Sequence, residues 1–140
     1  MTFGSEWVTM VEASLDARKK TAFRMLDGIF NEGILIVIDE TCAENIVVHV
    51  SRSVDDIKGI KAFKDYVKGF LEAFADIHLH VDDIHAEGDT VDIHATFIAT
   101  NIAPFHGMPA TKGEVTTAPV FFFKFGPDGK IVEHWQESLL

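Results

Sequence analysis

Two polar side chains stand where acid/base chemistry on an apolar molecule could take place. Glu137 lies near the C-terminus, in an apolar segment whose period of two places it on one strand face with Glu133 and Trp135. Asn101 ends the alternating run 93–99, on the face that this run turns to the core. In a dry pocket, a carboxylate can remove a proton beside a carbonyl group, and an amide can stabilise the resulting enolate. The alternative interpretations are a solvated glutamate and an asparagine that caps the following loop.

Metal binding is a second kind of chemistry to consider, because the chain contains seven histidines. His78, His80 and Asp82 alternate along one strand face, a spacing that resembles some metal-binding motifs. No second cluster of ligands accompanies them, and alternating polar residues are typical of a strand with one face in solvent. We therefore expect no metal. His94 has the opposite parity to Ile93, so we expect it on the outer face of the sheet.

Composition narrows the class of protein. The 140 residues are 47% hydrophobic and 24% charged, as expected of a single folded domain over residues 1–140. The formal net charge is −10, and so acidic a surface repels phosphate backbones and anionic lipid, so nucleic acid and membranes are not expected partners. Nucleotide-binding glycine motifs are absent, so we expect no cofactor. With Cys42 as the only cysteine and no signal-peptide pattern, a cytoplasmic location is expected.

Hydrophobic periodicity predicts helices in the first half of the chain. Apolar residues recur at helical spacing up to Asn31, and Gly33 is a plausible stop for that helix. Gly59 precedes another amphipathic stretch. The expected segments are a loose lead-in to about Met10, helices at about 11–31, 35–42 and 60–75, a short extended piece at 46–50, and a loop of sequence SRSVDD.

The second half changes to a period of two, which is typical of strands. The alternation slips at Asp82-Asp83, which predicts a bulge, and Glu87-Gly88-Asp89 predicts a tight turn. Helices followed by consecutive antiparallel strands indicate an α+β fold with the helices on one face of the sheet. The segment Phe121–Phe125 is apolar on both strand faces, so we expect a homodimer through the outer face. The expected strands start at Ile77, Thr90, Glu114 and Lys130 and reach Glu87, Ala103, Phe125 and Ser138, with a loop at 104–113.

A series of local motifs occurs in a fixed order along most of the chain. The motifs are Phe30-Asn31-Glu32-Gly33, Val48-His49, Gly59 with Phe63, Ala75-Asp76, Glu87-Gly88-Asp89-Thr90-Val91, Phe105-His106-Gly107-Met108-Pro109-Ala110-Thr111, and Asp128-Gly129-Lys130-Ile131-Val132-Glu133-His134-Trp135. In this order they resemble the SnoaL-like polyketide cyclases of the NTF2-like (ketosteroid-isomerase-like) superfamily.

The resemblance implies a cone-shaped barrel, in which a strongly curved antiparallel sheet wraps around the N-terminal helices and leaves an apolar pocket at its open end. It implies an apolar or aromatic ligand and a cofactor-free cyclisation or isomerisation. In the family the catalytic acid lies on the face of the tryptophan, which is why Glu137 is the candidate base. The resemblance implies pocket contacts from Trp135, His49, His106, Phe97, Phe30 and Phe63.

Two positions depart from the family pattern. Asn101 stands where the family loop has a histidine. Leu139 stands at the distance after Trp135 where the family carries its acid. A non-catalytic module that binds a small molecule, or that mediates association on the same fold, is therefore the alternative function.

Overall fold

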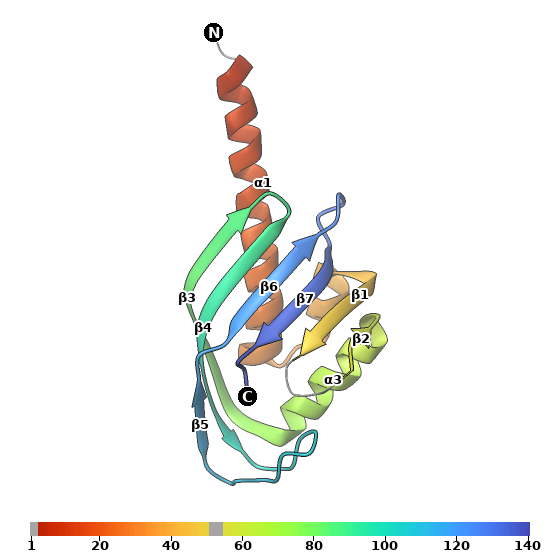
Figure 1. Cartoon of the computed structure of the whole chain (residues 1–140), viewed down its shortest axis with the longest axis vertical. Coiled ribbons are helices and arrows are strands. Elements are labelled where there is room, and N and C mark those ends of the chain that lie inside the picture. Colours follow the sequence, from red (N-terminus) through yellow and green to blue (C-terminus); the bar gives the residue numbers. More distant parts are fainter. Residues whose placement is uncertain (1–2, 51–54) are drawn as a thin grey trace.

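The structure is a computed structural model that describes residues 3–50 and 55–140, with side chains described from Ala13 onward. Its helices confirm the two shorter predicted helices and most of the first one. The predicted loose lead-in to Met10 is wrong, because the first helix already begins at Phe3. Figure 1 shows the N-terminal turns of α1 extending beyond the sheet. A helical segment that does not cover the sheet needs no apolar stripe, so hydrophobic periodicity does not reveal it in the sequence. The helices are α1 (Phe3–Leu26), the π-helical η1 (Asp27–Glu32), α2 (Ile36–Thr41) and α3 (Ile60–Ala73).

The predicted stop at Gly33 is confirmed. Gly33 has a left-handed conformation with φ 66° and donates its backbone N–H to the Gly28 carbonyl, which ends η1. Gly28 lies so close to α2 that a Cβ atom there would come within 2.5 Å of Val37 Cγ1. The predicted SRSVDD loop falls mostly on residues 51–54, which lie outside the described residues.

The sheet is mixed rather than wholly antiparallel. It has seven strands in the order β2-β1-β7-β6-β4-β3, with β5 paired to β4. The expected antiparallel pattern holds for the pairs β1–β2, β3–β4, β4–β5, β4–β6 and β6–β7, but β1 runs parallel to β7, a pairing that joins distant parts of the chain. The strands are β1 (Cys42–Val50), β2 (Ile57–Lys58), β3 (Phe74–Glu87), β4 (Thr90–Asn101), β5 (Glu114–Thr117), β6 (Val120–Phe125) and β7 (Ile131–Glu137).

Two predictions about the strands have different outcomes. The bulge at Asp82-Asp83 is confirmed, because the β3–β4 register shifts between Val81 and Asp83. The single strand predicted over 114–125 is wrong. The chain breaks at 118–119, so β5 pairs with the far end of β4 while β6 pairs with its beginning. Pro119 lacks a backbone N–H and cannot continue the ladder, which accounts for the break.

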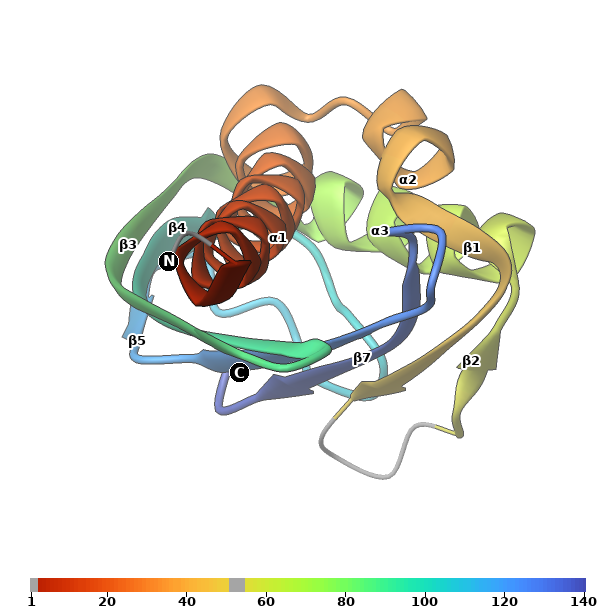
Figure 2. The same cartoon turned by 90° about the horizontal axis from the view of Figure 1, so that it is seen from above.

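The sheet curves around the helices, which lie on its inner face. Figure 2, viewed from above, shows β3, β4 and β7 wrapping past α1, with α3 beside it. The stripe predicted on α3 is buried, including Phe63, Val67 and Phe70. Alternate residues of β4 and β6 are buried with them, because successive side chains of a strand point to opposite faces. In the described part of the chain, no helix combines the length and apolar character that crossing a membrane requires.

Candidate functional site

The curved sheet divides the candidate residues between two sites. We call the side that faces α1 and α3 the inner face, and the opposite side the outer face. Phe30, Phe63, Phe97 and Asn101 belong to the inner side, where all four are buried. Trp135, His49 and Glu137 lie together on the outer face, and His106 lies on the loop after β4. The structure therefore does not bring the predicted base and the predicted amide donor together.

The inner face is lined by aromatic rings that pack on one another. The ring centroid of Phe30 lies 5.6 Å from that of Phe70 and 6.2 Å from that of Phe97. Phe63 lies in the first turn of α3, and its ring centroid is 6.1 Å from that of His134. Such edge-on and tilted contacts are favourable for aromatic pairs. The inner side is thus a mainly aromatic core in which these rings are buried.

His134 and Gln136 form a polar pair within this aromatic core, and the sequence analysis assigned a candidate role to neither. His134 is 0% exposed and Gln136 is 4% exposed. The Phe122 carbonyl lies 3.0 Å from His134 Nδ1 and can only accept, so Nδ1 carries the proton. His134 Nε2 then accepts a hydrogen bond from the Gln136 side-chain amide at 3.2 Å. Burial lowers the pKa of His134 to about 4, so the imidazole is neutral near pH 7.

A bulge in β7 explains why alternation pointed to the wrong side chains. Phe125 pairs with Ile131 and Lys124 with Glu133, so one step along β6 matches two steps along β7. Val132 is the extra residue, and it reverses the parity of the strand. In a regular strand without this extra residue, Glu133, Trp135 and Glu137 would share the inner face with the buried Ile131. A slip of one residue exchanges the two faces, so His134 and Gln136 point inward instead.

Asn101 anchors the loop that follows β4. Its amide nitrogen donates to the carbonyls of Ala73 at 3.2 Å and Ala103 at 3.0 Å. Its carbonyl oxygen accepts from the Thr111 backbone N–H at 2.7 Å. Both polar atoms of the side chain are therefore occupied, by this loop and by the last residue of α3. The geometry matches the loop-capping interpretation of Asn101.

His106 belongs to the same loop, which packs against α3. Its ring stacks on Tyr66 with centroids 5.3 Å apart. The neighbouring Phe105 is buried, and its ring lies 5.5 Å from Tyr66 and 5.4 Å from Phe70. Burial raises the pKa of Tyr66 to about 12, so its hydroxyl stays protonated. Phe105 thus closes the inner aromatic cluster from the loop side.

The position expected to carry the family acid contributes to the core instead. Leu139 is 4% exposed, and its carbonyl accepts a hydrogen bond from Thr117 Oγ1 at 2.7 Å. The buried polar or charged side chains among the described residues are Thr41, Asn101, His134 and Gln136. None of the buried polar side chains among the described residues is therefore a carboxylate.

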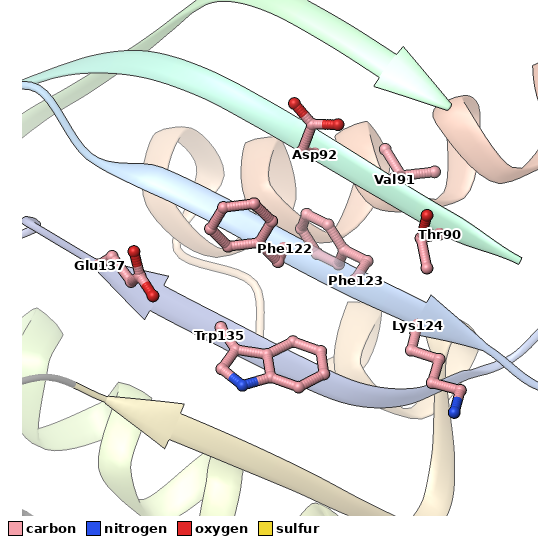
Figure 3. A pocket seen from close by; sticks show the side chains of 8 residues that line it. All are labelled: Thr90, Val91, Asp92, Phe122, Phe123, Lys124, Trp135 and Glu137. Carbon is pink, nitrogen blue, oxygen red and sulfur yellow. The ribbon is translucent and has the colours of Figure 1, made fainter. Parts of the chain in front are cut away.

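Figure 3 shows the outer-face site, in which Trp135, Phe122 and Glu137 lie on the side of the sheet away from α1. Trp135 and Phe122 are cross-strand partners at its centre. Glu137, Asp92 and Lys124 surround them and, with Thr90, help line a groove of about 440 Å³. Phe122 is 38% exposed, which is unusual for a phenylalanine in the middle of a sheet.

His49 extends this outer-face site onto β1. Its ring stacks on the Trp135 indole with centroids 5.1 Å apart. Its Nε2 lies 2.6 Å from Glu133 Oε2 and its Nδ1 lies 2.8 Å from Asp56 Oδ1. The hydrogen bond with Glu133 above all, together with Asp56, raises the pKa of His49. The protonated form of His49 is therefore favoured beside an aromatic surface.

The remaining histidine motifs lie on the outer side of the sheet. His94 Nε2 lies 3.6 Å from Asp92 Oδ2, on the exposed face as expected. In the His78-x-His80-x-Asp82 motif, the Asp82 carboxylate accepts from Thr96 Oγ1 at 2.8 Å. Within residues 3–50 and 55–140, no three histidine, cysteine or acidic side chains converge in a way that could hold a metal ion.

Comparison with known proteins identifies the class and then the family. The architecture is that of the NTF2-like cone, and a family model for SnoaL-like polyketide cyclases matches residues 20–138. The chain belongs to the SnoaL-like polyketide cyclase family. The comparison with curated proteins gives no match.

Solved structures of other proteins share this fold. A candidate SnoaL-like polyketide cyclase from Jannaschia Sp. CCS1 superposes with a TM-score of 0.80 at 22% identity, covering 89% of this chain and 86% of the other. AclR, a candidate hydroxylase from Streptomyces galilaeus, has a TM-score of 0.73 at 29% identity, with coverages of 89% and 90%. IdmH, a candidate polyketide cyclase from Streptomyces antibioticus, has a TM-score of 0.70 at 23% identity, with coverages of 87% and 91%.

Proposed function

We propose that this protein binds an apolar or aromatic small molecule carrying a carbonyl group, between the inner face of the sheet and the helices. His134 and Gln136 would be its polar contacts. The observation that carries the proposal is this pair, an imidazole hydrogen-bonded to an amide among phenylalanine rings. Replacing both partners of a buried hydrogen bond by apolar residues of similar shape can be nearly neutral for stability, so the fold does not require this pair. Recognition of a polar group on an otherwise apolar ligand does.

Polyketide-like and steroid-like ketones are the ligands to test first. The family name points to polyketides, and flat rings suit a surface made of phenylalanine side chains. A carbonyl oxygen can accept a hydrogen bond from the Gln136 amide, which otherwise donates to His134. Entry requires displacement of Phe105, since that ring packs on Tyr66 and Phe70 at the loop side.

Acid/base catalysis is the second candidate function, and the hydrogen bonds of His134 favour it. Its imidazole is neutral, and its Nδ1 proton is held by the Phe122 carbonyl, so Nε2 is the basic atom. When the carbonyl oxygen of a ligand accepts the hydrogen bond of the Gln136 amide, His134 Nε2 loses that bond. Nε2 can then accept a proton from the carbon next to the ligand carbonyl. The amide then stabilises the enolate oxygen, and the imidazolium returns the proton to another atom of the same substrate. Such an isomerisation or ring closure needs no cofactor.

The test combines thermal shift and turnover measurements on a panel of polyketide-like and steroid-like ketones. Gln136→Leu keeps the size of the side chain but removes one neutral hydrogen bond, so it should weaken binding about 10-fold. His134→Gln should abolish any turnover while leaving some binding. Ligand binding without turnover in the wild-type protein would identify a binding module.

Glu137→Gln is the matched control, because this neighbour of Gln136 lies on the outer face. It should change neither binding nor turnover. Loss of turnover in Glu137→Gln would instead identify Glu137 as the base and contradict the role of the inner pair. Unchanged affinity in Gln136→Leu would contradict the proposed carbonyl contact.

A further inference from the structure

The loop between β4 and β5 has a tip, residues 104–110, that carries one buried side chain. Of these residues, all of which the structure describes, Phe105 alone is buried. Its ring centroid lies 5.4 Å from that of Phe70 and 6.1 Å from that of Phe74. In Figure 1 this loop lies beside the C-terminal end of α3, the helix that carries Phe70. Phe105 therefore covers one end of the inner aromatic core.

The part of the tip that holds Phe105 is a tight turn with its own hydrogen bonds. Phe105 and Met108 each donate a backbone N–H to the carbonyl of the other, at 3.0 Å and 2.9 Å. The two residues between them, His106 and Gly107, both have positive φ angles, 41° and 81°. Two such residues in succession are typical of the tightest turns of β-hairpins. The turn therefore holds the Phe105 backbone in a fixed conformation, and the two move as one piece.

Hydrogen bonds fix the two ends of this loop but not its tip. The Ile102 backbone N–H donates to the Ala73 carbonyl at 2.8 Å, and the Thr111 backbone N–H donates to Asn101 Oδ1 at 2.7 Å. Within the described part of the chain, the residues of the tip make their hydrogen bonds only with one another. Packing contacts, above all those of the Phe105 ring, hold the tip against α3. The tip can therefore swing outward about the fixed ends of the loop without breaking a hydrogen bond.

We propose that the tip is a gate to the inner side and that Phe105 is its gating side chain, which decides how fast a ligand enters. Behind Phe105 lies Phe70, whose ring centroid is 5.6 Å from that of Phe30 and 5.7 Å from that of Phe97. Outward movement of Phe105 therefore uncovers this aromatic cluster, which suits the entry of an apolar or aromatic molecule. The inference rests on the proposed function, because a gate has a use only if a ligand binds on the inner side.

A glycine lies under the gating side chain. A Cβ atom at Gly69 of α3 would be 3.9 Å from Phe105 Cε1, an ordinary van der Waals distance. Alanine therefore fits beneath the closed gate and adds a contact to it. Glycine inside a helix is normally less favourable than alanine. Gly69 thus keeps the contact under the gate weaker than the available space allows.

Labelling of a buried thiol measures the opening of the gate without any ligand. Val67→Cys places a thiol of similar size on the buried side of α3, one turn before Phe70, and N-phenylmaleimide serves as an apolar aromatic probe. Adding Phe105→Ala should raise the labelling rate at position 67 at least about 10-fold, because opening no longer exposes a phenylalanine ring. Adding Gly69→Ala instead should lower this rate about 2-fold, because the new methyl group contacts the closed gate.

Native Cys42 is an internal control for general unfolding. It is buried elsewhere in the core, with its Sγ 3.6 Å from Met25 Sδ. Peptide mass spectrometry measures labelling at both positions, and the ratio of the two rates separates gate opening from unfolding even if Phe105→Ala is less stable. This ratio should rise in Phe105→Ala and fall in Gly69→Ala. An unchanged ratio in Phe105→Ala, or a higher ratio in Gly69→Ala, would overturn the proposed gate.

Phe23→Ala is the matched control, because it removes a phenylalanine that is 41% exposed on α1, and it should leave the ratio unchanged. Since these rates need no ligand, the gate and the proposed function fail separately. A gate that opens in a protein that binds no ketone would contradict only the ligand contacts proposed for His134 and Gln136. Ketone binding together with an unchanged ratio in Phe105→Ala would contradict only the gate.

Discussion

At the scale of single residues, His134 and His49 show how one side-chain type takes opposite roles on the two faces of a strand. His134 is completely buried, and burial outweighs its hydrogen bond to the Phe122 carbonyl, so its pKa falls to about 4. His49 lies on the outer face between Glu133 and Asp56, and these carboxylates raise its pKa. The first histidine is therefore suited to a neutral interior, and the second to a charged surface.

Acid should destabilise the fold through His134. An unfolded histidine binds a proton near pH 6.5, whereas folded His134 resists protonation down to about pH 4. The unfolded state therefore binds more protons in this window, and the free energy of unfolding falls by about 3 kcal/mol as the pH drops from 7 to 4. Urea unfolding at a series of pH values measures this loss.

His134→Gln should lose clearly less stability than wild type between pH 6.5 and 4. His49→Gln is the control, since a histidine with a raised pKa is protonated in both states once the pH is well below the unfolded value of 6.5, so it adds little pH dependence towards pH 4. Parallel stability profiles for His134→Gln and wild type would contradict the neutral state of the buried imidazole.

At the scale of elements, small local irregularities decide what each segment presents. The π-helical η1 brings Gly28 against Val37 of α2, and the extra residue Val132 turns His134 and Gln136 inward. Asn101 ties the end of β4 to the loop that carries Phe105. Gly28, Val132 and Asn101 thus help to position the inner site without being proposed ligand contacts themselves.

Gly28→Ala should destabilise the contact between η1 and α2. Alanine is normally the better helix former, but its Cβ would lie 2.5 Å from Val37 Cγ1, so overpacking of about 1–3 kcal/mol should dominate. In the Val37→Ala background the same change should cost much less, or stabilise. A double-mutant cycle by chemical denaturation measures this coupling. Independent effects of the two substitutions would show that the contact is not tight.

At the scale of the whole molecule, the last strand of the chain holds a central place in the sheet. β7 pairs with β6 on one side and, in parallel, with β1 on the other. The first half of the chain is thereby joined to the second half through its C-terminal residues. The sheet that results separates the buried inner face from the exposed outer face.

Hydrogen exchange should reflect this arrangement. Amides of β7 should exchange as slowly as those of β6, although β7 ends close to the C-terminus, because both of its edges are paired. Amides of the short edge strand β2 should exchange first among the strands. Native-state exchange followed by mass spectrometry or NMR measures the order. Fast exchange throughout β7 would contradict its central position.

The sequence by itself determined the kinds of elements, most of their bounds and the family, because hydrophobic periodicity and turn residues act over a few neighbours. The helix that ends at Gly33 and the bulge at Asp82-Asp83 were predictable for that reason. Only the tertiary structure decided which face of β7 turns inward. One extra residue, Val132, reverses the alternation, and its presence depends on the register with β6. The parallel pairing of β1 with β7 is likewise a contact between distant segments, which no local pattern specifies.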